Sequence, residues 1–175
     1  MRPTYFTYIL IFLLSLPSIV CAAENSKMEA FHTSGLPLPR FVSVEDKKTN
    51  VRAGPGEKYP ILWVIERKNL PLEVILEFEN WRKIKDIEGQ EGWIFQGLLS
   101  GKRTGLVKAK EKAPVYERPY EKIDENSILS MYLEPLVVVK LEACDGAWCK
   151  ISSAGFSGWL QRKYIWGVYE SENFH

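Results

Sequence analysis

The stretches Trp81-Arg82-Lys83-Ile84 and Glu91-Gly92-Trp93-Ile94 decide the fold, because the chain repeats both of them in the same order. They return as Trp148-Cys149-Lys150-Ile151 and Ser157-Gly158-Trp159-Leu160. Such a match within one chain indicates a duplicated module, so the length of 175 residues must be divided before a fold is inferred.

Two upstream landmarks extend the repeat in the same order. Residues 70–75 match residues 134–139, and residues 50–55 loosely match residues 114–119. Each repeat unit is too small to contain a large enzyme core. The duplication therefore predicts two compact β units.

Short apolar runs separated by turn residues indicate strands in both units. In the first unit we expect strands at 41–44, 50–52, 61–65, 72–78, 81–85 and 93–95. In the second unit we expect them at 106–107, 115–116, 127–132, 136–142, 147–152 and 158–161. Because no stretch has a sustained helical apolar period, the chain is predicted to be all-β, with a small antiparallel barrel or sandwich in each unit.

Residues 1–22 differ in character from the rest of the chain. Arg2 is their only charged side chain, and residues 9–16 form an apolar run that Pro17 interrupts. This pattern predicts a secretory signal peptide, cleaved after Ala22 or the following residue, and hence a periplasmic or secreted protein. The alternative is an uncleaved membrane anchor, which is disfavoured because the apolar run is short for a bilayer.

The remaining chain divides into three segments. Residues 23–39 lack periodicity and contain prolines, so they are predicted to form a flexible tail. The first module is expected to span residues 40–101 and the second residues 105–169. No stable membrane span is expected once the signal peptide is removed.

The charges of the chain are nearly balanced. There are 23 Lys and Arg against 22 Asp and Glu, which gives a formal net charge of +1. Arg2 leaves with the signal peptide, so the exported chain is formally neutral. The basic residues are scattered among acids, and a nucleic-acid partner is therefore not expected.

Two cysteines, Cys144 and Cys149, follow the signal peptide. An even count in an exported chain favours a disulfide, which would stabilise a small module by about 2 kcal/mol. The alternative is a metal or redox site on the same pair. It is disfavoured because no histidine lies nearby and the spacing differs from that of redox motifs, so no metal or cofactor is expected.

Catalytic groups are scarce in this sequence. The two histidines are His32, in the predicted tail, and His175, so nucleophilic or metal-dependent catalysis is not expected. A glycosidase would need a carboxylate pair, but the candidate pairs are interpreted as solvated turn residues. These pairs are Glu77 with Glu79, Asp86 with Glu88, and Glu88 with Glu91. The sequence therefore predicts a protein that is not an enzyme.

Aromatic side chains are abundant, with 6 Trp, 8 Tyr and 8 Phe, and small barrels cannot bury all of them. Trp93 and Trp159 recur beside glycine and are interpreted as packing residues, while Arg52 is expected to place its guanidinium on turn carbonyls. Six others are predicted to be partly exposed ligand-binding residues, with semi-buried packing as the competing interpretation for each. They are Tyr59, Trp63, Trp81, Tyr116, Tyr120 and Tyr132.

The motif Asn50-Val51-Arg52-Ala53-Gly54-Pro55, a following strand, Trp-x-x-Ile and Gly-Trp-Ile together resemble the bacterial SH3-like (SH3b) domain. Over residues 36–169 the chain is similar to two-module, exported members of that family from alphaproteobacteria. The second module departs from the motif, since Pro114-Val115-Tyr116 replaces Asn-Val-Arg. The resemblance implies a barrel of about five to six strands per module and a binding role, without an activity.

Export, duplication, aromatic content and the resemblance together favour a non-catalytic, tandem SH3-like binding protein of the cell envelope. Its expected ligand is peptidoglycan or a peptide. The alternative is a protein-interaction scaffold that docks an envelope enzyme or receptor, for which exposed edge strands and an apolar patch would be needed.

Overall fold

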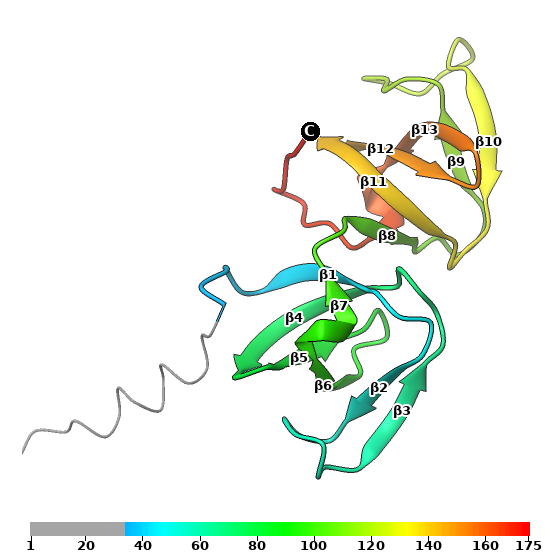
Figure 1. Ribbon diagram of the computed structural model, residues 1–175. Helices are drawn as coiled ribbons and strands as arrows, with labels where there is room; N and C mark the ends of the chain where they lie inside the picture. The colour runs from blue at the N-terminus through cyan, green and yellow to red at the C-terminus, as the bar shows by residue number, and fades with distance from the viewer. Residues whose placement is uncertain (1–33) are drawn as a thin grey trace, which may run out of the picture.

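The computed structural model describes residues 34–175 and folds them into two antiparallel sheets, one above the other in Figure 1. The first module is a seven-stranded sheet with the order β3-β2-β6-β5-β4-β1-β7. Its strands are β1 (Arg40–Val44), β2 (Thr49–Arg52), β3 (Ile61–Ile65), β4 (Pro71–Phe78), β5 (Trp81–Lys85), β6 (Glu91–Phe95) and β7 (Leu99–Ser100), with the 3-10 turn η1 (Gln96–Leu98) before β7.

The second module repeats this arrangement in the order β10-β9-β13-β12-β11-β8-β14. Its strands are β8 (Thr104–Val107), β9 (Ala113–Tyr116), β10 (Leu129–Leu133), β11 (Val138–Asp145), β12 (Trp148–Ser153), β13 (Phe156–Gln161) and β14 (Ile165–Trp166), with the 3-10 turn η2 (Arg162–Tyr164) before β14. The shared order confirms the prediction of two tandem all-β modules. Each sheet exceeds the implied five to six strands because the short β7 and β14 pair with β1 and β8.

The glycine of each repeated Gly-Trp lies against a valine side chain of the neighbouring strand. A Cβ atom on Gly92 would lie 2.3 Å from Cγ1 of Val51, and one on Gly158 would lie 2.5 Å from Cγ1 of Val115. Because glycine has no Cβ, the valine side chain fits there and β2 can pair with β6 and β9 with β13. The repeat that reveals the duplication is therefore a packing requirement of the fold.

Each module has its own apolar core, formed by alternate residues of its strands. The first contains Val44, Val51, Ile65, Leu72, Val74, Ile84 and Ile94. The second contains Val107, Ala113, Val115, Leu133, Val139, Leu141, Cys144, Cys149, Ile151, Leu160 and Ile165.

Residues 34–39 are docked against the first module, so the prediction of a flexible tail is wrong for this part. Both the backbone N–H and the hydroxyl of Ser34 donate to the Glu77 carboxylate, each at 2.8 Å, and Leu38 packs against the core. The rest of the predicted tail, residues 23–33, and the predicted signal peptide, residues 1–22, lie outside the described residues.

One cross-strand position carries different chemistry in the two modules. In the first, Glu77 on β4 lies opposite Arg82 on β5, and its carboxylate is 3.1 Å from the Arg82 Nε. In the second, Cys144 on β11 lies opposite Cys149 on β12, and the two form a disulfide, as predicted. An ion pair and a covalent bond thus join the same pair of strands in the two copies.

The two modules meet through aromatic and polar contacts. The ring of Phe41 on β1 lies 5.1 Å from that of Trp166 and 4.7 Å from that of Tyr169. The Tyr169 hydroxyl donates to Glu73 on β4 at 2.9 Å. Burial, together with the Glu73 carboxylate, raises the pKa of Tyr169. The last strand of the second sheet and the residues after it therefore pack onto the first module.

We expect Tyr169→Phe to lower the free energy of unfolding by about 1–2 kcal/mol, because it removes one hydrogen bond to a largely buried carboxylate. Urea unfolding of the two proteins measures the difference. Tyr132→Phe is the matched control, since Tyr132 is 57% exposed. Equal effects of the two substitutions would contradict the proposed role of this contact.

Glu77→Gln should destabilise the protein by about 3 kcal/mol, because it leaves the guanidinium groups of Arg40 and Arg82 without their buried carboxylate. Thermal and urea unfolding measure the loss. Glu66→Gln, at an exposed position of the first module, should change stability little.

The effect of Glu77 should depend on pH. Burial alone would raise the pKa of this carboxyl, but hydrogen bonds from Ser34 and Arg40 outweigh it and hold the pKa at about 2, below the ordinary value of 4.5. A lowered pKa stabilises the folded state fully above 4.5, and this contribution is lost as the pH falls toward 2. The stability difference between the wild type and Glu77→Gln should therefore shrink over that range. A constant difference would refute the assignment.

Candidate functional site

An aromatic cluster forms at one end of the second module, where β9 runs into the loop of residues 117–128. Tyr116 ends β9 and lies opposite Trp159 on β13. Trp148 begins β12, and Tyr120 lies in the loop. The sheet thus gathers residues from three strands and a loop.

Ring contacts and hydrogen bonds fix the geometry of this cluster. The Tyr116 ring meets those of Tyr120 and Trp148 edge to face, with centroids 5.8 and 5.6 Å away. The indole N–H of Trp148 donates to the carbonyl of Tyr120 at 3.1 Å, and the N–H of Ile128 donates to the Tyr120 hydroxyl at 2.9 Å. Burial raises the pKa of Tyr116. These contacts hold the loop against the sheet.

A hollow of about 460 Å³ opens beside the cluster. It has three aromatic side chains on its wall, and the exposed acids Glu121 and Asp145 lie at its margin. We call it the aromatic hollow, and its lining residues are Pro119, Tyr120, Glu121, Asp145, Gly146, Ala147, Trp148 and Trp159. Flat rings beside carboxylates can stack on sugars or hold an extended peptide, and they favour a ligand that carries positive charge.

The first module has a different arrangement at the equivalent position. Arg52 replaces Tyr116, and its guanidinium donates to the carbonyls of Glu57 at 3.0 Å and Tyr59 at 2.8 Å. This confirms the structural role predicted for Arg52. The Tyr59 ring packs over Gly54, where a Cβ would lie 2.5 Å from it. The loop of residues 53–60 is thus held by the Arg52 guanidinium, whereas the Tyr116 ring contacts the corresponding loop of the second module edge to face.

The six predicted ligand-binding residues do not form one site. Tyr59, Trp63 and Trp81 belong to the first module, where Trp63 packs against the core and Trp81 contacts Phe95 edge to face at 5.8 Å. Tyr116 and Tyr120 lie together in the second module. Tyr132 lies elsewhere, 57% exposed on the edge strand β10.

The prediction that Tyr116 is partly exposed is wrong, because only 7% of it is accessible. Tyr120, Trp148 and Trp159 cover it from the loop and the neighbouring strands. Tyr116 supports the aromatic hollow from beneath and does not line it.

The sequence analysis did not predict two aromatic residues of the aromatic hollow. Trp148 entered it only as part of the repeated motif, and Trp159 is interpreted there as a packing residue. Trp159 is half-buried on β13, as Trp93 is on β6, but it also lines the hollow. The signal that could have identified them is the loop of residues 117–128, which is longer than its counterpart at 53–60.

The acidic pairs considered for catalysis are engaged in local structure. Asp86 accepts hydrogen bonds from the backbone N–H groups of Glu88 at 2.9 Å and Gln90 at 2.8 Å. The Glu91 carboxylate pairs with Lys83 at 2.5 Å. Within residues 34–175, no group of three or more His, Cys, Asp or Glu is placed to hold a metal ion.

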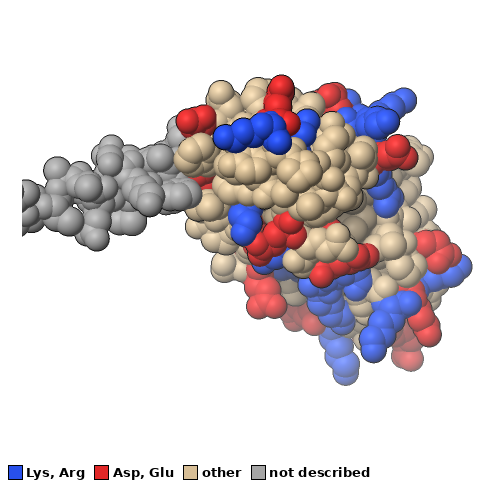
Figure 2. All heavy atoms as spheres, turned by 90° about the horizontal axis from the view of Figure 1, so that it is seen from below, with Lys and Arg blue, Asp and Glu red and all other residues tan. Residues whose placement is uncertain are grey.

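The surface carries charged side chains of both signs. Figure 2 shows basic and acidic side chains interspersed on the face that it presents. Across the described part of the chain, no helix is long and apolar enough to cross a membrane.

Comparisons with known proteins bear on both modules. No curated protein sequence matches the chain significantly. Among solved structures, NlpC1 from Trichomonas vaginalis is similar with a TM-score of 0.34 and 9% identity, over 76% of this chain and 47% of that one. NlpC2 from the same organism gives a TM-score of 0.34 and 9% identity, over 78% of this chain and 51% of that one. This chain thus spans about half the length of each.

The model of the bacterial SH3 domain family matches the chain twice, at residues 45–101 and 109–167. The two matches fall on the two sheets and include both copies of the repeated Gly-Trp. The chain therefore belongs to the bacterial SH3 domain family, with two copies of the domain in tandem.

Proposed function

We propose that the protein is a non-catalytic binding protein of the cell envelope, and that its ligand, peptidoglycan or a peptide, binds in the aromatic hollow. The observation that carries this proposal is the convergence of Tyr120, Trp148 and Trp159 around one open volume with two acids at its margin. Bacterial SH3 domains often bind the cell wall or peptidoglycan, so membership of the family supports an envelope ligand.

The chemistry of the hollow suits binding rather than turnover. Aromatic faces gain free energy from contact with sugar rings or apolar side chains without any reacting group. A peptide in extended form could lie across the rings as in other groove-binding modules. The turn acid Asp86 and the ion-paired Glu91 are held by neighbours in the first module, which favours a structural role for them.

We further propose that the protein acts in the periplasm or is secreted. The features of residues 1–22 favour export, and the Cys144–Cys149 disulfide suits an oxidising compartment.

A protein-interaction scaffold is the second candidate function, and the edge strands favour it. β3 and β10 lie at equivalent edges of the two sheets and expose Leu62 (52%) and Tyr132 (57%). An edge strand has unpaired backbone groups that can add a strand from a partner, so an envelope enzyme or receptor could dock there.

Sedimentation with purified sacculi tests the primary proposal. We expect Trp159→Ala to reduce the bound fraction by about tenfold, because one ring of the aromatic hollow is lost. Trp93→Ala is the matched control, since Trp93 holds the equivalent register in the first module and should leave binding intact. Circular dichroism verifies that both variants are folded.

Two outcomes would argue against this function. Wild-type protein that stays in the supernatant at low and high salt would refute wall binding. Equal loss in both variants would show that the aromatic hollow is not the site. Crosslinking in the periplasm that recovers one protein and no glycan would instead support the scaffold.

A further inference from the structure

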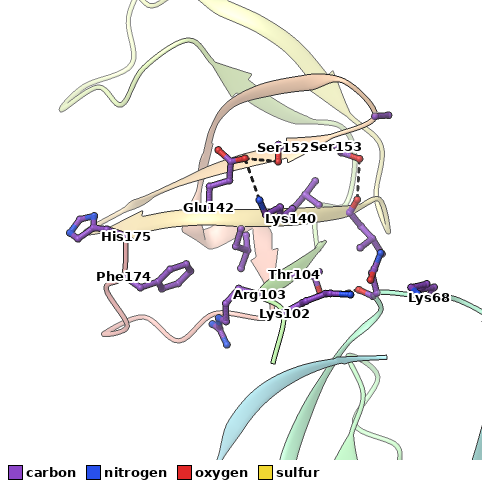
Figure 3. A pocket seen from close by; sticks show the side chains of 15 residues that line it. Lys68, Lys102, Arg103, Thr104, Lys140, Glu142, Ser152, Ser153, Phe174 and His175 are labelled. Carbon is purple, nitrogen blue, oxygen red and sulfur yellow. Dashed lines mark hydrogen bonds and ion pairs between the residues drawn. The ribbon is translucent and has the colours of Figure 1, made fainter. Parts of the chain in front are cut away.

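A second cavity, separate from the aromatic hollow, lies at the junction of the two modules (Figure 3). Its volume is about 730 Å³. Lys68 reaches it from the loop between β3 and β4, and Lys102 from the segment that joins the modules. Lys140 on β11 and Ser152 on β12 form the opposite side. We call it the junction cavity, and both modules are needed to form it.

Lys68 and Lys102 lie on the lower side of the junction cavity in Figure 3 and share one carboxylate. The Nζ of Lys68 lies 3.3 Å from the Glu45 carboxylate, and the Nζ of Lys102 lies 3.0 Å from it. These interactions lower the pKa of Glu45 to about 2, with the hydrogen bond from Lys102 as the largest cause. Two ammonium groups against one carboxylate leave one positive charge in excess at this side.

The upper side of the junction cavity has one lysine and one carboxylate in its lining, Lys140 and Glu142. The Glu142 carboxylate lies 3.9 Å from the Nζ of Lys140 and 3.9 Å from that of Lys150, which approaches from β12 outside the cavity lining. Ser152 donates its hydroxyl hydrogen to Glu142 at 2.8 Å. Within the lining, Lys140 and Glu142 therefore balance in formal charge, and the excess positive charge of the junction cavity comes from the lower side.

Arg103 also lines the junction cavity, but its charge is already paired. Its guanidinium lies 2.7 Å from the Glu172 carboxylate and donates to the Gly167 carbonyl at 3.1 Å. The same group lies over the Phe174 ring, 5.2 Å from its centroid. Arg103 therefore holds the wall together, and the exposed lysines are the donors that a ligand can reach.

We propose that the junction cavity binds an oxyanion, the phosphate or carboxylate group of a small organic ligand. The ammonium groups of Lys68, Lys102 and Lys140 supply the charge-assisted hydrogen bonds. The half-buried ring of Phe174 offers an apolar surface for the rest of the ligand. Because the lysine donors come from both sides of the junction cavity, an anion between them stabilises the junction of the modules as it binds.

Titration with pyrophosphate and with citrate, at fixed ionic strength and followed by amide NMR shifts, tests this site. We expect saturable shifts at the lining residues. The double variant Lys102→Gln with Lys140→Gln should raise the dissociation constant by about tenfold. Lys47→Gln with Lys122→Gln removes the same number of charges from exposed positions outside the junction cavity, and should leave binding within about twofold of the wild type.

The outcomes separate the possible sources of the anion. Binding of pyrophosphate alone assigns the site to phosphate groups, and binding of citrate alone assigns it to carboxylates. Absence of saturable shifts with either probe overturns the proposal, as does equal weakening in the two double variants, which would indicate general charge attraction. Pyrophosphate and citrate are not the ligands proposed for the aromatic hollow. The sacculus experiment can therefore fail or succeed independently of this titration.

Discussion

A contact between a valine and a glycine closes each module, and the rest of the structure depends on it. Val51 packs on Gly92 and Val115 on Gly158, so that β2 lies against β6 and β9 against β13. Any larger side chain at the glycine would separate these strands. The same pairing places the end of β9 beside β13. The aromatic hollow forms there, because the loop after β9 folds back against Trp148.

The two copies keep this frame and vary the chemistry attached to it. Where β4 and β5 are joined by the buried Glu77–Arg82 ion pair, β11 and β12 are joined by a disulfide. Where Arg52 holds its loop by hydrogen bonds to carbonyl oxygens, Tyr116 contacts its loop through an edge-to-face ring pair. A buried ion pair requires neighbours to satisfy both partners, whereas a disulfide does not. The residues around the disulfide in the second copy therefore do not have to compensate buried charge.

Much of the fold could be predicted from the sequence, because its determinants are local or repeated. The Gly-Trp pairs, the alternating strands, the Arg52 loop and the close cysteines each depend on residues near one another in the chain. The errors involve distant partners. Tyr116 is buried by Trp148 from another strand, and residues 34–39 dock because Glu77 accepts from Ser34. The aromatic hollow and the junction cavity are likewise built from separate segments, so neither has a linear motif.

The packing of Phe41 against Trp166 and Tyr169 also fixes how the two modules sit relative to each other. Residues 101–103 leave little chain between the two sheets, and the aromatic contact fastens them further. Two domains on a loose tether can change their relative placement. Domains fastened in this way keep one placement, so a surface built from both of them, such as the junction cavity, is formed before any ligand arrives.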